Sequence, residues 1–325
     1  MKITTKKSAA FAATLSAAAF MAMYVVPASS QPPAGAPGAS GASGRGRGGG
    51  GGFTHAPAAD FNNHDGFTSI YDGKSLAGWD GDANLWSVRD GAIYIAATCE
   101  KPTGTVYLVW QGGEVGDFDL KLEMKGTGSI NGGVQYRSWI TSDPNAPQQP
   151  GRGGGAGGGG GARGGSGRGP GGGSGGFGAG RGPAAPCPSG QPRGTAPDRA
   201  SQLKWDMGGP QYDFDNNNQY PGQLYEQATG RGIIAWKGEV VETLEGGRKQ
   251  LLSSLGDVSS YYNKDNWNTL EIIAIGNVMS HFMNGHLMSV TIDNEKSRFH
   301  PKGKIGIEVE ATGELFTRNI WLKKY

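Results

Sequence analysis

Strict alternation of apolar and polar residues over 118–124 constrains the fold of this chain more than any other feature. Here Phe118, Leu120, Leu122 and Met124 alternate with Asp119, Lys121 and Glu123. A period of two places the apolar side chains on one face of a half-buried β-strand and the charged ones on the other. Comparable runs occupy residues 134–138, 270–275, 277–283, 305–310 and 318–322.

Turn residues separate these runs, and few segments show helical spacing. Asn284-Gly285, directly after the run at 277–283, is a hairpin signal. Short strands divided by regular turns are typical of a sandwich or jelly roll. The sequence therefore predicts an all-β fold, a jelly-roll sandwich of two antiparallel sheets.

Two glycine-rich tracts interrupt this pattern. They hold most of the 60 glycines among the 325 residues. Such tracts bury too little apolar surface to offset the entropy of ordering them. We expect 31–58 to be a flexible spacer and 143–199 a disordered insertion in a loop of one domain, 59–325. The net charge of +2 and the scarcity of aromatics among the Gly-Arg runs argue against a nucleic-acid partner.

The first 30 residues have the pattern of a secretory signal. Lys2, Lys6 and Lys7 precede an apolar stretch at 9–26, and small residues follow at 28–30. We expect cleavage there, export to the periplasm or the extracellular space, and no stable membrane span afterwards. An uncleaved anchor is the alternative, because the apolar stretch is nearly long enough to span a membrane.

The chain has two cysteines, Cys99 and Cys187. An oxidising compartment would allow them to pair. Sequence cannot say whether their Cα atoms come within bridging reach, so a disulfide and two free thiols both stay open.

Polar side chains gather on the outward faces of two predicted strands. Gln135 and Arg137 share one such face, and Glu308 and Glu310 share another. If these strands belong to one concave sheet, their polar groups converge on one groove. A sugar-binding jelly roll is built in this way.

Several short motifs, taken in order, resemble a bacterial family of 3-keto-disaccharide hydrolases, also described as 3-keto-glucoside lyase/hydratases. They are GFTSIYDGKSLAGW at 66–79, WSVRDG at 86–91, GDFDL at 116–120, NGGVQYRS at 131–138, LYE at 224–226 with RG at 231–232, WN at 267–268, HFMNG at 281–285 and FTRNIWL at 316–322. The resemblance covers 61–325 without the glycine insertion. It implies a concanavalin A-like jelly roll that is often exported.

The resemblance also implies a chemistry. A ketone at C3 of a glucoside acidifies the hydrogen on C2, so a base can remove it and the C1 substituent can leave. Water then adds to the resulting enone. The reaction needs a base near C2, an acid near the glycosidic oxygen and a group that polarises the ketone.

Titratable residues in or near these motifs are the candidates for these tasks. For catalysis we single out Asp206, Glu226 and His281. For substrate binding we single out Gln135, Arg137, Tyr212, Tyr225, Arg231, Glu308 and Glu310. Each of them could instead be structural.

Glu308 and Glu310 depart from the family, whose members often have Gln and then a polar residue or His there. Two carboxylates on one face could divide acid and base roles, as in ordinary glycosidases. They could also bind a divalent cation through oxygen ligands. Asp213, Asp215 and Asn217 have the spacing of a calcium loop, but the glycine and glutamate that complete an EF-hand are missing.

The substrate expected from the resemblance is a small carbohydrate, a 3-keto-glycoside. A non-catalytic carbohydrate-binding module of the same fold is the alternative.

Overall fold

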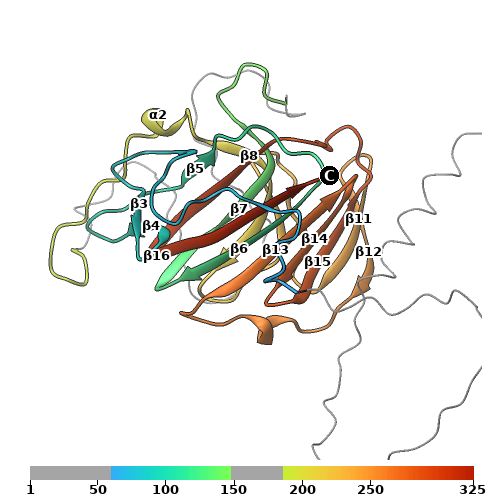
Figure 1. The fold of residues 1–325 in the computed structure, drawn as a ribbon. Helices are drawn as coiled ribbons and strands as arrows, with labels where there is room; N and C mark the ends of the chain where they lie inside the picture. The colour runs from blue at the N-terminus through green and yellow to red at the C-terminus, as the bar shows by residue number, and fades with distance from the viewer. Residues whose placement is uncertain (1–59, 148–185) are drawn as a thin grey trace, which may run out of the picture. The chain divides into compact units, whose positions relative to one another are not determined.

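The computed structural model describes residues 60–147 and 186–325. The predicted signal peptide, the predicted spacer and most of the predicted insertion lie outside these ranges. Within them nearly all regular structure is β, as predicted, and the fold is a jelly-roll sandwich (Figure 1). In the part of the chain described, no helix is long and apolar enough to span a membrane.

We name the two layers sheet A and sheet B. The strands of sheet B, in spatial order, are β10 (Gly232–Ala235), β9 (Leu224–Gln227), β8 (Met207–Asp215), β7 (Ser129–Ile140), the first half of β16 (Lys304–Lys324), β5 (Val106–Trp110) and β2 (Trp79–Asp80). All neighbouring strands in sheet B are antiparallel.

Sheet A forms the other layer. Its spatial order is β12 (Arg248–Ser254), β11 (Glu239–Leu244), β15 (His286–Asp293), β14 (Val278–Met283), β13 (Asn268–Ile275), β6 (Phe118–Gly126) and the second half of β16. Beyond β16 lie β1 (Thr68–Ser69) and β4 (Ala92–Ala97), with β3 (Ser87–Arg89) outside β4. The predicted antiparallel pairing holds except between β11 and β15, which are parallel.

Strand β16 joins the layers, because its 21 residues belong to both (Figure 1). Residues 304–312 pair with β7 in sheet B, and residues 315–324 pair with β6 in sheet A. The strand changes sheets at Ala311 and Gly313, whose φ angles are +66° and +148°. The runs at 305–310 and 318–322, predicted as separate strands, are therefore one continuous strand.

The core lies between the sheets and follows from the alternation. Ile305, Ile307 and Val309 point inward from sheet B, and Leu120 and Leu122 from sheet A, each at most 1% exposed. The side chains between them in sequence point outward. On sheet B, Gln135, Glu308 and Glu310 of the predicted polar set point outward.

The outward face of β6 differs from the prediction, because residues 60–67 cover it. Lys121 is only 5% exposed, and its Nζ donates hydrogen bonds to the carbonyls of Asp60 (3.1 Å) and Asn63 (3.0 Å). Asp119 is 7% exposed beside it. The strand is thus buried on both faces at Asp119 and Lys121, while Glu123 and Lys125 farther along are partly exposed. Alternation identifies the two faces but not what covers the polar one.

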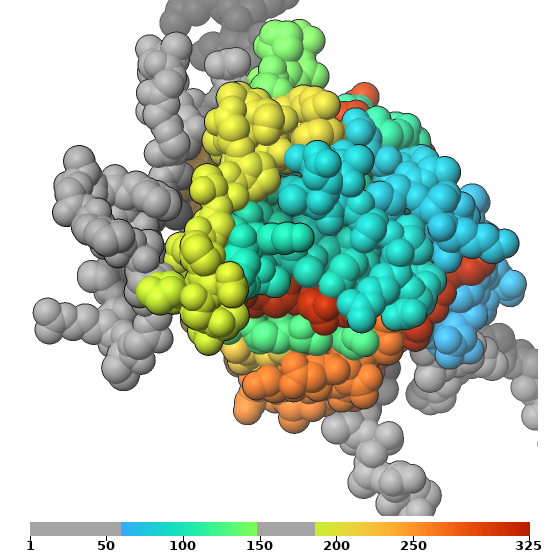
Figure 2. Space-filling model, turned by 90° about the vertical axis from the view of Figure 1, so that its left-hand side faces the viewer, coloured from blue at the N-terminus to red at the C-terminus, as the bar shows by residue number. Residues whose placement is uncertain are grey.

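The last part of the predicted insertion, residues 186–199, falls in the described chain. A disulfide joins Cys187 to Cys99, with 5.6 Å between the two Cα atoms. The Gly194 amide also donates to the Cys99 carbonyl at 3.0 Å. Figure 2 shows this yellow-green segment against the cyan surface that follows β4. The segment leads through the short helix α2 (Arg199–Gln202) into β8.

Candidate functional site

The outward face of sheet B carries a cluster of acids that we call the acidic face: Asp213, Glu308 and Glu310. Glu308 on β16 lies opposite Gly133 on β7, which in turn lies opposite Asp213 on β8. Two interstrand spacings separate the Cα atoms of Glu308 and Asp213, roughly 10 Å. Glu308 and Glu310 project from one face of one strand, as the sequence predicted.

Gln211 lies between Glu308 and Asp213, the two central acids of the acidic face, because Gly133 has no side chain. A Cβ on Gly133 would come within 2.3 Å of the Tyr212 carbonyl oxygen and 2.8 Å of Gln211 Nε2. The absent side chain lets the Gln211 amide lie against the sheet. Gln211 Nε2 donates to Glu308 Oε2 at 2.8 Å.

A chain of hydrogen bonds reaches Gln211 from β7. Ser138 Oγ donates to Gln135 Oε1 at 2.8 Å, and Gln135 Nε2 donates to Gln211 Oε1 at 2.5 Å. All three side chains are at most 4% exposed. Gln135 therefore belongs to this face, as predicted, but acts on the acids through Gln211.

Burial shapes the protonation of the central acids. It raises the pKa of Glu308 well above its usual value, and the nearby Glu310 and Asp213 raise it further, whereas the Gln211 hydrogen bond lowers it. Burial likewise raises the pKa of Asp213, which Gln223 opposes by donating to Asp213 Oδ2 at 2.5 Å. Two acids with raised pKa values on one face suit proton transfer near neutral pH.

Glu310 stands at the margin of the face with polar neighbours. It accepts hydrogen bonds from Asn131 Nδ2 at 2.7 Å and Thr105 Oγ1 at 3.2 Å. Its side chain is partly exposed, whereas Glu308 is 3% exposed. The two carboxylates of β16 thus have different surroundings.

Two tyrosines flank the acids. Burial raises the pKa values of Tyr107 on β5 and Tyr225 on β9, and the charge of Glu308 raises both further. Their hydroxyls therefore stay protonated and can donate hydrogen bonds. Tyr225 is partly exposed, and Tyr107 accepts a hydrogen bond from Gln227 at 3.0 Å. Tyr225, a predicted substrate contact, lies opposite Gln211 in the register of β8 and β9.

Asp206 reaches the edge of the acidic face from the segment before β8. Its neighbour Trp205 packs with Tyr107, Val109 and Met207 on that face. Asp206 Oδ2 pairs with Arg199, while Oδ1 is buried without a partner. Burial raises the pKa of Asp206, against the effect of Arg199. The candidate Asp206 is therefore beside the site rather than at its centre.

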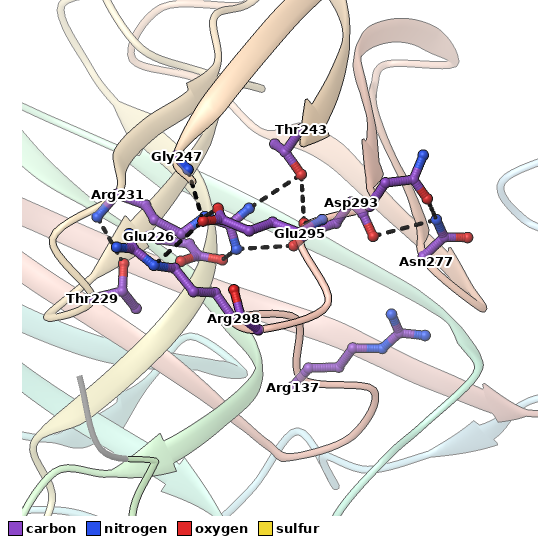
Figure 3. A network of polar contacts seen from close by, with 12 residues as sticks. Arg137, Glu226, Thr229, Arg231, Thr243, Gly247, Asn277, Asp293, Glu295 and Arg298 are labelled. Atoms are coloured by element: carbon purple, nitrogen blue, oxygen red, sulfur yellow. Dashed lines mark hydrogen bonds and ion pairs between the residues drawn. The ribbon is translucent and has the colours of Figure 1, made fainter. Parts of the chain in front are cut away.

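Glu226 and Arg231, which were predicted to act in the site, lie in a separate ion-pair network (Figure 3). Arg231 Nη1 is 3.1 Å from Glu226 Oε1 and 2.9 Å from Asp293 Oδ2, and its Nε is 3.5 Å from Glu295 Oε2. Burial raises the pKa of Glu226 to about 7, against the effect of Arg231. Because Glu226 follows Tyr225 directly, its side chain points to the opposite face of β9.

His281 and Tyr212 are core residues rather than parts of the acidic face. His281 is 0% exposed, its Nε2 is 2.9 Å from Tyr136 Oη, and burial lowers its pKa to about 3. Tyr212 Oη donates to the Phe282 carbonyl at 3.2 Å. An imidazole that remains neutral and enclosed between the sheets does not fit the predicted catalytic role.

Arg137 is also structural, because β7 is irregular where it occurs. The pairing of β7 with β8 shifts register between Gln135 and Trp139, and Arg137 has a φ of +48° in the left-handed region. Its guanidinium donates to the carbonyls of Gly116 and Gly276 and to the Asp117 carboxylate. Figure 3 shows it apart from the Arg231 network. The prediction that it shares a face with Gln135 is wrong.

From the sequence, Glu308 and Glu310 could bind a divalent cation. The described residues form no cluster of three or more His, Cys, Asp or Glu suited to a metal. Asp215, in the stretch that resembled a calcium loop, accepts the backbone N–H groups of Asn217, Gln219 and Tyr220 instead. That carboxylate caps a turn.

Sequence reasoning missed Gln211 and Tyr107, and assigned Asp213 only to a loop. Asp213 lies on β8, and its alternation with Tyr212 and Phe214 could have placed it outward. Tyr107 lies in the run VYLVW, where no polar residue marks the outward face. For Gln211 the signal was its spacing of two from Asp213.

Comparison with known families tests the resemblance that the sequence motifs suggested. The model of the 3-keto-alpha-glucoside-1,2-lyase-like domain matches residues 66–153 and 193–323. The chain belongs to this family. It is therefore a carbohydrate-active protein by descent. A search of curated proteins found no match.

Solved structures with a similar course of the chain are distant in sequence. A Parabacteroides distasonis protein named "Putative glycosyl hydrolase" is 12% identical, with a TM-score of 0.43, covering 80% of this chain and 99% of that one. The Bacillus subtilis carbohydrate-binding module CBM66 is 9% identical, with a TM-score of 0.39, covering 76% and 96%. Bacillus licheniformis β-glucanase is 11% identical, with a TM-score of 0.36, covering 82% and 95%. Similarity at this level carries no argument about function.

Proposed function

We propose that this protein is an exported enzyme that cleaves 3-keto-glycosides by elimination followed by hydration. The observation that carries the proposal is the pair Glu308 and Asp213, two buried acids with raised pKa values on either side of Gln211. Family membership supplies the substrate class. The signal-like sequence at 1–30 supports export to the periplasm or the extracellular space.

The reaction needs one group that accepts a proton and one that donates a proton. A carboxylate on the acidic face takes the proton from C2, and the C–H electron pair forms an enolate with the C3 ketone. When the enolate collapses, C1=C2 forms, the C1–O bond breaks and the leaving oxygen receives a proton from the second acid. Water then adds its hydroxyl to C1 and a proton to C2, so the net reaction is hydrolysis.

The neighbouring tyrosine can stabilise the developing charge. Tyr225 remains protonated because burial and the nearby acids raise its pKa. The residue is partly exposed, and its hydroxyl can donate a hydrogen bond to the ketone oxygen as negative charge grows there. We assign this role to Tyr225 rather than to Arg137 or Arg231, which were predicted to bind substrate, because their guanidinium groups are bound elsewhere.

The test compares two chromogenic substrates that differ only at C3. The mature protein is incubated with 4-nitrophenyl 3-keto-glucoside and with 4-nitrophenyl glucoside, in both anomers. Release of nitrophenol above the rate without protein, from the keto substrate only, supports elimination. Release from both indicates an ordinary glycosidase, with Glu308 and Glu310 as its carboxylates. Sugar binding without release identifies a carbohydrate-binding module.

A further inference from the structure

The two central acids of the acidic face are held by glutamines in different ways. Glu308 accepts from Gln211, whose own carbonyl oxygen accepts from Gln135. Asp213 accepts chiefly from Gln223, whose carbonyl oxygen is buried and has no partner, while Gln211 lowers the pKa of Asp213 to a smaller extent. One amide is therefore anchored at both ends, and the other at one end.

An amide that cannot turn over favours one charge state of the carboxyl group beside it. If Gln211 turned over, its oxygen would face Glu308 and its NH₂ group would face the NH₂ group of Gln135. Ser138 opposes this reversal, because its hydroxyl lies nearest to Gln135 Oε1, at 2.8 Å against 3.0 Å to the Tyr136 carbonyl and 3.2 Å to the Pro210 carbonyl. A hydroxyl that donates to Gln135 Oε1 directs the Gln135 NH₂ group toward Gln211. Glu308 therefore always meets an N–H donor, which favours its carboxylate form.

Gln223 has no such constraint. Its carbonyl oxygen has no donor to lose, so the amide can turn over and present that oxygen to Asp213. Protonated Asp213 can then donate to the oxygen, and ionised Asp213 can accept from the NH₂ group. Asp213 thus keeps a partner in either protonation state.

From this contrast we propose that Ser138, Gln135 and Gln211 form a positioning chain that makes Glu308 the base and leaves Asp213 as the acid. The assignment rests on the proposed function. The Glu308 carboxylate takes the C2 proton, the C–H electrons move into the C1=C2 bond through the enolate, and the C1–O bond breaks. Asp213 gives its proton to the leaving oxygen.

Other charged and titratable groups also face Glu308 and act on its proton affinity. They are Glu310 on its own strand, Asp213 on β8, Tyr225 on β9 and Tyr107 on β5. Asp206 and Arg199 act on Tyr107 from the edge of the face. The test therefore uses a neutral substitution in the chain, which leaves all these charges in place.

The variant Gln135→Met removes the donor that anchors Gln211 and adds no charge. Freed Gln211 can turn over and take its N–H donor away from Glu308, so we expect the pKa of Glu308 to rise by up to about one to two units, the size of one lost hydrogen bond to a carboxylate. NMR of the free enzyme with ¹³C-labelled carboxyl groups measures it directly. The acidic limb of the pH profile of kcat/KM should move up equally.

The matched variant is Gln223→Met, which removes the donor from Asp213. It should raise the pKa of Asp213 and move the alkaline limb of the profile, because the acid then keeps its proton to higher pH. Ser138→Ala, which keeps both amides, should shift Glu308 as Gln135→Met does but by less. It serves as the second variant if Gln135→Met does not fold.

The NMR titration separates this inference from the proposed function, because it needs no turnover. A protein that cleaves no keto-glycoside, yet shows the Glu308 shift, loses the proposed function and the catalytic roles but retains the positioning chain. If Gln135→Met and Ser138→Ala leave Glu308 unmoved, or move Asp213 as much as Glu308, the positioning chain is refuted. Movement of the alkaline limb alone in Gln135→Met would reverse the two roles.

Discussion

Removal of the Cys99–Cys187 disulfide should destabilise the domain strongly, because the bond closes a long loop. The two cysteines are 88 residues apart in sequence. For a loop of this length, the loss of unfolded-chain entropy amounts to about 4.6 kcal/mol at 25 °C, and removal of native disulfides typically costs roughly 2–5 kcal/mol. We therefore expect Cys99→Ser/Cys187→Ser to lose about 2–4.6 kcal/mol of unfolding free energy.

Urea unfolding followed by tryptophan fluorescence measures this loss. With an m-value near 3 kcal/mol/M, the midpoint should fall by about 0.7–1.5 M. Reductant should lower the wild-type midpoint to that of the double variant and should not affect the double variant. Equal midpoints for the oxidised wild type, the reduced wild type and the double variant would refute the pairing and its effect on the unfolded chain.

Three further substitutions test the packing and electrostatics around the sheets. Arg231→Met leaves three buried carboxylates without their shared cation and should cost about 3–5 kcal/mol in thermal unfolding, whereas Arg318→Met, at a partly exposed pair, should cost under about 1 kcal/mol. Similar losses would contradict the network. Gly133→Ala should cost about 1–3 kcal/mol because its Cβ meets the next strand, while Gly116→Ala, with 3.7 Å to its nearest neighbour, should be tolerated. Burial and then Glu271 raise the pKa of Asp119 to about 7, so the native state binds the proton more tightly and stability falls as pH rises from about 4 to 7. Asp119→Asn should flatten that fall and be more stable than the wild type at pH 8 by on the order of 2 kcal/mol. A pH dependence of stability that is unchanged in this variant would argue against a raised pKa of Asp119.

The sequence was informative wherever a strand is regular. Alternation alone placed Glu308 and Glu310 on one face and the neighbouring isoleucines in the core. It failed at Arg137, because a bulge breaks the period of two there and nothing in the local sequence marks it. The same failure would be expected at any irregular strand.

Assignment of the site residues needed the register between strands. Tyr225 and Glu226 share a motif, but consecutive residues of a strand point to opposite faces, and only the pairing of β9 with β8 shows which one meets the acids. His281 lies two residues from Met279 and two from Met283, both in the core, so alternation could have placed it inward, although histidine itself gives no signal for burial. Whether Cys99 and Cys187 pair likewise depended on the distance between their Cα atoms, which their spacing in the sequence does not give.

Isosteric variants of Glu308 and Asp213 test whether these two residues carry out the acid/base chemistry. Release of 4-nitrophenol from the keto-glucoside is measured for the wild type, Glu308→Gln and Asp213→Asn. The controls are Glu226→Gln and Asp119→Asn, which change buried acids away from the acidic face. We predict that each of the first two variants lowers kcat about 10²–10⁴-fold, the usual contribution of a general acid or base, while folded controls retain most activity. Activity that survives in Glu308→Gln and Asp213→Asn but is lost in folded Glu226→Gln would show that the acidic face is not the active site and would move the site to the Arg231 network.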